Sequence, residues 1–179
     1  MAEDVLATIE RLAAAKPLRP GLRIRFGWSM LTLREMNGEW ILCEPDFDGD
    51  PLNDVRPDIS TTLDVVSRQT AFARRVGVRP VDATFDQFIL IGRGAWDAHD
   101  IQLFRDESRD ADDSGWSLAP ANAPSAGDRD AEYDAVRTFD ALRKRPSILP
   151  VLVLPPGYAV TMAGDKVGFI LDPDGNARP

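Results

Sequence analysis

The sequence predicts an α+β fold with mixed or antiparallel sheets, two principal helices and an additional N-terminal helix. Short segments in which apolar and polar residues alternate, as in half-buried strands, recur along the chain. Segments with helical periodicity stand singly between clusters of these strands. Because strands and helices do not alternate regularly, a doubly wound parallel sheet is not expected.

The first part of the chain predicts a helix followed by a strand meander. Apolar residues recur at helical spacing over residues 3–16, and Pro17 and Pro20 end this helix. Asn37-Gly38 favours a tight hairpin turn, because both residues tolerate a positive φ. The strands expected around this turn lie at residues 22–26, 30–36 and 40–43. A polar, acidic loop is expected from Pro45 to Pro57.

The first principal helix is expected at residues 60–76. Ser60 or Thr61 can cap its N-terminus, and Asp64 is assigned to the first turn, where a negative charge is favourable. Gly77 can terminate the helix. The inner face is expected to consist of Leu63, Val66, Ala73 and Val76.

The second principal helix is expected at residues 130–144 and ends before Pro146. Its inward residues are expected to be Tyr133, Val136, Phe139 and Leu142. The remaining strand candidates are residues 87–91, 101–104, 148–154, 158–162 and 167–171. Because the pattern is interrupted near residues 77–86, we expect an N-terminal half at 1–82 and a C-terminal domain at 83–179, or one core that is continuous through both.

Composition and charge restrict the function classes. The net charge is −8. This charge disfavours binding to nucleic acids and to anionic membranes, because proteins bind both mainly through their own Lys and Arg side chains. Cys43 is the single cysteine, and the N-terminus has no signal-peptide pattern, so a cytoplasmic location is expected. Two segments, 44–58 and 97–113, carry the excess of acidic residues. An acidic surface of this kind steers association with basic partners.

The motifs that carry chemistry in other proteins are incomplete here. His99 is the single histidine and lies in an acidic segment, so neither a nucleophile–histidine pair nor a zinc site is expected. Asp46-Phe-Asp48-Gly-Asp50 resembles the start of a calcium loop, but Pro51 and Pro57 occupy positions that the loop needs for a glycine and a glutamate. We therefore expect a solvated turn there, no metal and no cofactor.

Trp116 leaves two alternatives open. It follows the acidic segment directly, so it can anchor an interface, where tryptophan is enriched. It can equally fill the core, which is the usual place of a tryptophan.

The residues Asp113-Ser-Gly-Trp116 also carry a resemblance. About 85 residues at the C-terminal end resemble the immunity protein 33 family of bacterial toxin-immunity proteins. The order of features is similar: a strand pair at 89–104, then Arg105, the acidic loop ending in Asp-Ser-Gly-Trp, Tyr133, Pro146-Ser-Ile148 and Pro156-Gly157. The chain departs from the family after Trp116, where Ser117-Leu-Ala-Pro120 replaces the usual polar segment.

The resemblance implies a protein that binds and neutralises a toxin acting in the cytoplasm and that is not an enzyme. The partner would be a protein toxin, basic if it is a nuclease. The residues expected at the interface are Asp106, Glu107, Asp110, Asp112, Asp113 and Trp116, followed by Asp46, Asp48 and Asp50. The alternatives are a regulatory or scaffold domain and a small carboxylate-dependent enzyme that binds a ligand or metal.

Overall fold

The computed structural model describes residues 7, 11, 18–123 and 132–179. The expected helix at 3–16 therefore lies largely outside the described residues. The chain forms an α+β fold of two compact units, Met1–Arg68 and Gln69–Pro179. This division falls within helix α2 (Ser60–Val76), whereas the interruptions in the sequence pattern lie at residues 77–86.

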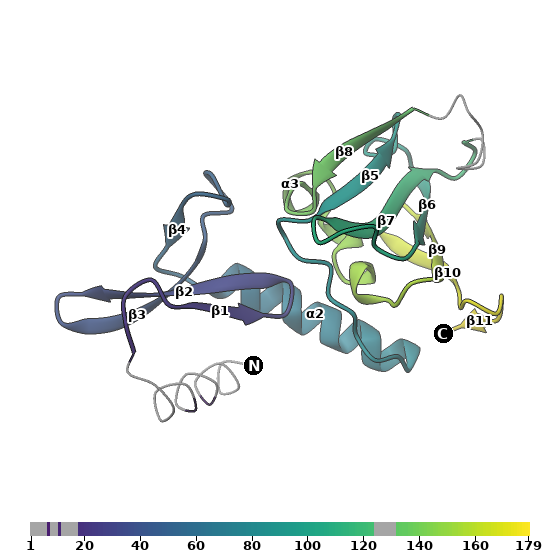
Figure 1. Ribbon diagram of the computed structural model, residues 1–179. Helices are drawn as coiled ribbons and strands as arrows, with labels where there is room; N and C mark the ends of the chain where they lie inside the picture. The colour runs from purple at the N-terminus through teal and green to yellow at the C-terminus, as the bar shows by residue number, and fades with distance from the viewer. Residues whose placement is uncertain (1–6, 8–10, 12–17, 124–131) are drawn as a thin grey trace. The chain divides into compact units, whose positions relative to one another are not determined.

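The first unit contains an antiparallel four-stranded sheet, with the strands in sequence order (Figure 1). The expected turn is confirmed: Asn37 and Gly38 have φ values of 54° and 80° and join the second and third strands. Buried side chains alternate along the second strand, and Trp28 stacks on Phe47 with ring centroids 5.2 Å apart. The strands are β1 (Arg23–Phe26), β2 (Ser29–Met36), β3 (Glu39–Pro45) and β4 (Val55–Arg56).

A buried carboxylate joins this sheet to the start of helix α2. The Glu44 side chain is fully buried, and its Oε1 lies 2.8 Å from Nη2 of Arg56. The same carboxylate accepts hydrogen bonds from the backbone N–H groups of Thr61 and Thr62, at 3.4 and 2.7 Å. Glu44 thus satisfies helix N–H groups that have no partner within the helix.

The expected capping of helix α2 needs correction. Asp58 accepts hydrogen bonds from the N–H and the hydroxyl of Ser60, so Asp58 and Glu44 cap the helix in place of Ser60 or Thr61. Asp64 lies beyond the first turn, which holds no acidic residue. At the other end Gly77 has a φ of 76° and its N–H donates to Ala73, as expected of a terminating glycine. The buried face is Thr62, Val65, Gln69, Phe72, Ala73 and Val76, so the expected positions Leu63 and Val66 are half-buried instead.

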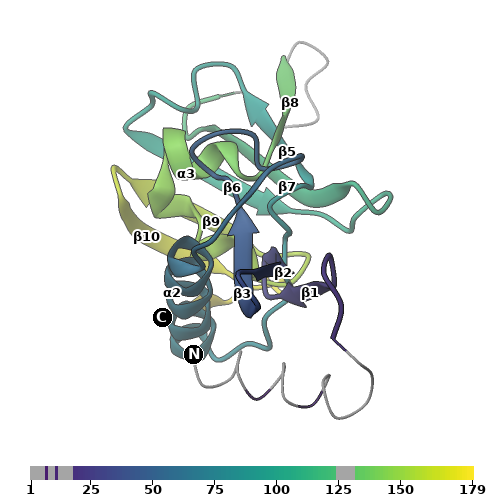
Figure 2. The ribbon, with the colours of Figure 1, turned by 90° about the vertical axis from the view of Figure 1, so that its left-hand side faces the viewer.

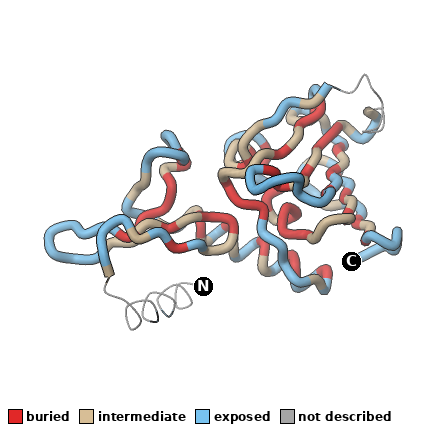
Figure 3. Tube along the Cα trace, viewed as in Figure 1, coloured by how far each residue is buried: buried red, intermediate tan, exposed pale blue. Residues whose placement is uncertain are grey.

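The second unit contains a seven-stranded mixed sheet in the order β11-β10-β9-β6-β7-β5-β8. The pair β5 and β7 is parallel, and the other neighbours are antiparallel. Figure 2 shows the sheet from a second direction, and Figure 3 shows buried residues recurring along its strands. The strands are β5 (Phe88–Gly92), β6 (Asp100–Arg105), β7 (Asp113–Pro120), β8 (Tyr133–Arg137), β9 (Ala159–Ala163), β10 (Lys166–Leu171) and β11 (Ala177–Arg178).

The prediction of a second principal helix at residues 130–144 is wrong for most of the residues that the structure describes. Residues 133–137 form strand β8, which pairs with β5, and helix α3 is confined to Asp140–Lys144. The guanidinium carbon of Arg137 lies 3.7 Å from the ring centroid of Phe88 on the neighbouring strand. Pairing with β5 satisfies the backbone groups that a helix would have satisfied locally, so the distant strand overrides the helical spacing.

The strand expected at residues 148–154 is also wrong. This run forms two 3-10 helices, η1 (Pro146–Ile148) and η2 (Val151–Val153), in which every residue from Ile148 to Leu154 except Pro150 is buried. Pro146 and Pro150 have no N–H group for a sheet and fix φ at values that suit a turn. The run therefore forms short 3-10 helices, and the carbonyl groups of Leu152 and Leu154 accept hydrogen bonds from side chains of the sheet.

We expect the Glu44→Gln substitution to destabilise the first unit by about 2 kcal/mol, because the buried side chain loses its charge-assisted hydrogen bonds to Arg56 and to the N–H of Thr62, although Arg56 keeps its ion pair with Asp48. Urea unfolding of the full chain measures this change. Glu39→Gln, at an exposed position of the same strand, serves as the matched control and should change the unfolding free energy by less than about 0.5 kcal/mol. Equal effects of the two variants would contradict this role of Glu44.

Candidate functional site

The candidate site is the acidic loop of residues 106–112, which joins the antiparallel strands β6 and β7. The two strands bring the ends of the loop together: the N–H of Asp106 donates to the carbonyl of Gly115 at 2.9 Å. The side chains of Asp106, Glu107, Asp110 and Asp112 are exposed. Four carboxylates therefore project from one short connection.

Asp113 holds the loop from its C-terminal end. Its Oδ2 accepts hydrogen bonds from the backbone N–H and Nε of Arg109, at 3.1 and 2.6 Å, and its Oδ1 accepts one from the N–H of Gly115. Burial raises the pKa of Asp113, but the hydrogen bonds from Arg109 and Gly115 outweigh it, so the net pKa is lowered. Asp113 is thus ionised at neutral pH and fixes the path of the loop.

The next two residues fit the loop to the sheet. The hydroxyl of Ser114 donates to the carbonyl of Phe88 on strand β5 and accepts from the N–H of Trp116. Gly115 has a φ of 77°, and a Cβ atom there would lie 2.2 Å from the carbonyl oxygen of Asp106. Only glycine allows both this conformation and this approach. The residues Asp113, Ser114 and Gly115 therefore fix the position of the acidic loop relative to the sheet.

Trp116 lies in the core. Its side chain is 1% exposed, and its Nε1 donates to the carbonyl of Leu152 at 3.0 Å. The guanidinium carbon of Arg105 lies 5.7 Å from the Trp116 ring centroid. Of the two alternatives for Trp116, the structure supports the core.

Arg105 is buried beneath the acidic loop. Its guanidinium donates to five backbone carbonyl oxygens, of Val81, Asp82, Ser114, Leu152 and Leu154. Burial lowers the pKa of Arg105 to about 10, and the charges of Asp82 and Glu107 oppose this shift. Arg105 therefore remains a cation at neutral pH and lies under a loop of opposite charge.

The acids of the first unit build their own turn. Asp46 accepts from the N–H groups of Asp48 and Gly49, and Asp48 forms an ion pair with Arg56. Asp50 accepts from Asn53 and from the N–H of Leu52, and these bonds lower its pKa, the Asn53 bond most. They lie in a different unit from the acidic loop. Among the described residues, no group of three His, Cys, Asp or Glu side chains is placed to hold a metal ion.

A hollow beside the acidic loop was not expected from the sequence. It has a volume of about 270 Å³ and combines Leu90 of β5 and Ser117 of β7 with four residues of the loop region, which are Asp106, Glu107, Arg109 and Asp113. Alternation along each strand is visible in the sequence and places Leu90 and Ser117 each on one face of its own strand. That the two residues lie opposite each other depends on the parallel pairing of β5 with β7, which the sequence does not reveal. None of the helices among the described residues combines the length and the apolar character needed to cross a membrane.

The fold and the loop define a small α+β protein that presents an acidic loop fixed to a sheet by hydrogen bonds. The model of the Imm33-like domain family matches residues 68–172, which is more than half of the chain. The chain therefore belongs to the Imm33-like family, as the resemblance implied. No curated protein and no solved structure matches it.

We expect Trp116→Ala to lower the unfolding free energy by about 4 kcal/mol, because it leaves a large cavity and removes the hydrogen bond to Leu152. Chemical denaturation measures this loss. Trp40, which is 43% exposed, provides the control, and Trp40→Ala should cost less than about 1 kcal/mol. A Trp116→Ala variant as stable as the wild type would contradict the core role.

We expect Asp113→Asn to lower the melting temperature by about 5 °C at pH 6, because the variant loses charge-assisted hydrogen bonds to Arg109 and Gly115. The folded-state pKa of Asp113 is below its unfolded value, so its stabilisation is present above about pH 4 and is lost as the pH falls further. The difference between wild type and variant should shrink from pH 6 to pH 3. In Asp112→Asn, which changes an exposed acid, no such pH-dependent difference is expected.

Proposed function

We propose that this chain is an immunity protein that neutralises a cytoplasm-acting bacterial toxin by binding it, and that it is not an enzyme. Membership of the Imm33-like family supports this function class. The single observation that carries the site is the acidic loop, in which Asp106, Glu107, Asp110 and Asp112 are exposed and the backbone is held from both ends.

The loop favours a basic partner surface. Arg109 is the cation within it, and its side chain is already paired with Asp113. The four exposed carboxylates therefore act together on an approaching cationic surface and raise the association rate. A toxin that binds nucleic acid has a positive substrate surface of this kind.

The function is tested by co-expressing the chain with the product of the adjacent open reading frame. Rescue of growth together with co-purification of the two proteins supports the immunity role. If the adjacent product is toxic, and the chain neither rescues growth nor binds it, the proposed function is wrong for that pair.

We expect the double variant Glu107→Lys/Asp112→Lys to associate with that partner about tenfold more slowly at low salt, because two steering charges are reversed. Stopped-flow association rates at several salt concentrations measure the effect, and the salt dependence should flatten. The control is Asp97→Lys/Asp165→Lys, which makes the same charge change at exposed turns next to the paired residues Asp100 and Ala163, at the opposite end of β6 from the loop. If both double variants slow association equally, net charge is responsible and the loop is not the site.

A further inference from the structure

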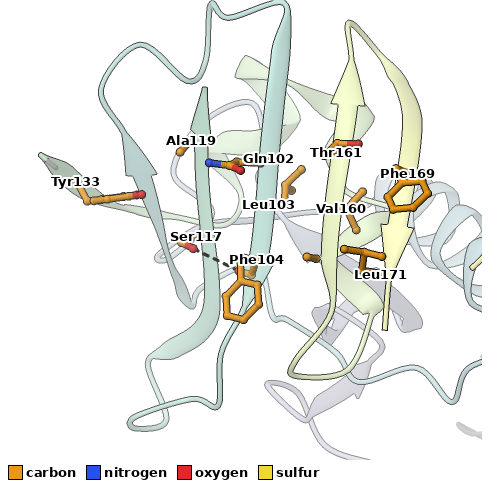
Figure 4. A pocket seen from close by; sticks show the side chains of 11 residues that line it. Gln102, Leu103, Phe104, Ser117, Ala119, Tyr133, Val160, Thr161, Phe169 and Leu171 are labelled. Atoms are coloured by element: carbon orange, nitrogen blue, oxygen red, sulfur yellow. Dashed lines mark hydrogen bonds between the residues drawn. The ribbon is translucent and has the colours of Figure 1, made fainter. Parts of the chain in front are cut away.

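One face of the seven-stranded sheet exposes two aromatic side chains that the acidic loop does not explain. Phe104 on β6 is 42% exposed and Phe169 on β10 is 49% exposed (Figure 4). On β6 the alternate residues Ile101 and Leu103 are buried, so they face the core and Phe104 faces the opposite side. Exposed aromatics that gather on one sheet face are typical of an interaction surface.

The strand register surrounds Phe104 with small side chains. Ser117 lies opposite Phe104 on β7, and Ala159 lies opposite it on β9. Leu171 of β10 lies opposite Ala159 and closes this row. Because serine and alanine are short, the space beside the Phe104 ring is not filled from the neighbouring strands.

A second row runs parallel to the first. Gln102 lies opposite Ala119 and Thr161, and Thr161 lies opposite Phe169. The register between β9 and β10 shifts between Val167 and Phe169, so Gly168 is an additional residue on β10. This bulge turns Phe169 to the same face as Thr161, whereas Val167 pairs with the buried Met162.

The two rows enclose a groove of about 330 Å³. Short side chains such as Ser117, Ala119 and Ala159 contribute to its lining, and Figure 4 shows Tyr133 and Phe169 toward its two sides with Phe104 between them. Ser117 lines both this groove and the hollow beside the acidic loop, so the apolar groove and the acidic hollow adjoin each other at this residue.

The shared border at Ser117 places an apolar space next to carboxylates, and this pairing is the basis on which we infer the chemistry of the ligand. The groove offers room for an apolar side chain, and the adjoining hollow offers the carboxylates of Asp106 and Glu107. A bound segment with an aromatic or aliphatic residue in the groove would bring its neighbouring residues against these acids. Basic neighbours are therefore favoured and acidic ones are repelled.

We propose that this groove binds a segment of the partner protein in which an apolar side chain is flanked by Arg or Lys. The proposal rests on the proposed function and names the surface and the partner chemistry that the acidic loop alone does not. The apolar side chain fills the groove between Phe104 and Phe169, and the flanking cations pair with Asp106 and Glu107.

The test is an NMR titration of the ¹⁵N-labelled full chain with capped heptapeptides. The probe has a central Phe flanked on each side by Arg, and two comparison peptides replace Phe by Ser or every Arg by Glu. We expect saturable shifts of the amides at residues 102–104, 117–119 and 159–161 with the probe. The affinity should be at least fivefold weaker for both comparison peptides. No saturable shifts up to millimolar probe, or equal shifts with the Glu peptide, would overturn the proposal.

Matched variants localise the binding. Ala159→Arg fills the groove, whereas Ala163→Arg places the same side chain on the same face of β9 outside it. We expect Ala159→Arg to weaken probe binding at least tenfold and Ala163→Arg less than twofold. Phe104→Ser, at an exposed position, should also weaken binding at least fivefold, and it replaces Ala159→Arg as the decisive variant if that protein melts early. Equal binding by all variants would show that the groove is not the site.

Three further outcomes separate this proposal from its alternatives. If the groove amides shift with protein concentration alone and the peptides add nothing, the face binds a second copy of the chain and the proposal is wrong. The titration does not depend on a toxin, so peptide binding together with failed growth rescue upholds the groove and rejects the immunity role. Growth rescue by both the wild type and Ala159→Arg, with no peptide binding, upholds the immunity role and rejects the groove.

Discussion

The buried guanidinium of Arg105 is the interaction on which the second unit depends. It donates to carbonyl oxygens of three separate chain segments: residues 81–82 in the connection that follows helix α2, Ser114 on β7, and Leu152 and Leu154 on either side of Val153. Buried irregular backbone has carbonyl groups that no ladder satisfies, and each would be costly to leave unpaired. A planar group with five N–H donors meets this need from one position. The indole of Trp116 adds a further donor to Leu152.

A second buried arginine also donates hydrogen bonds to several backbone carbonyl groups elsewhere in this unit. Arg145 donates to the carbonyls of Ala95, Ala98, His99 and Gly164. The core side of the sheet can therefore be covered by 3-10 turns and loops, which arginines hold together. Because these turns and loops cover one face of the sheet, its other face, which carries Phe104 and Phe169, remains exposed and available for binding.

The predictions from sequence succeeded where the relevant interactions are local. The hairpin at Asn37-Gly38, helix α2 with its end at Gly77, and strands β9 and β10 follow from alternation, helical spacing and turn chemistry. The failures lie at residues 133–137 and 148–154, whose conformation depends on pairing with β5 and on donors from Arg105. Those partners are distant in sequence and leave no periodic signal. The motif ending in Trp116 identified the family correctly, but its residues act in the fold: Asp113 and Gly115 shape the loop, and Trp116 fills the core.

The acidic loop and the groove have separate physical roles in the proposed complex. Exposed charges act over about 8 to 10 Å at physiological ionic strength, so the loop accelerates encounter but contributes little to the lifetime of the complex. Lifetime depends on desolvated apolar contacts, and affinity differences between related complexes arise mostly in dissociation rates. The groove supplies such contacts next to the loop, since Ser117 borders both. An inhibitor must both reach its target before damage occurs and remain bound, and a charged loop fixed beside an apolar groove meets both requirements on one sheet.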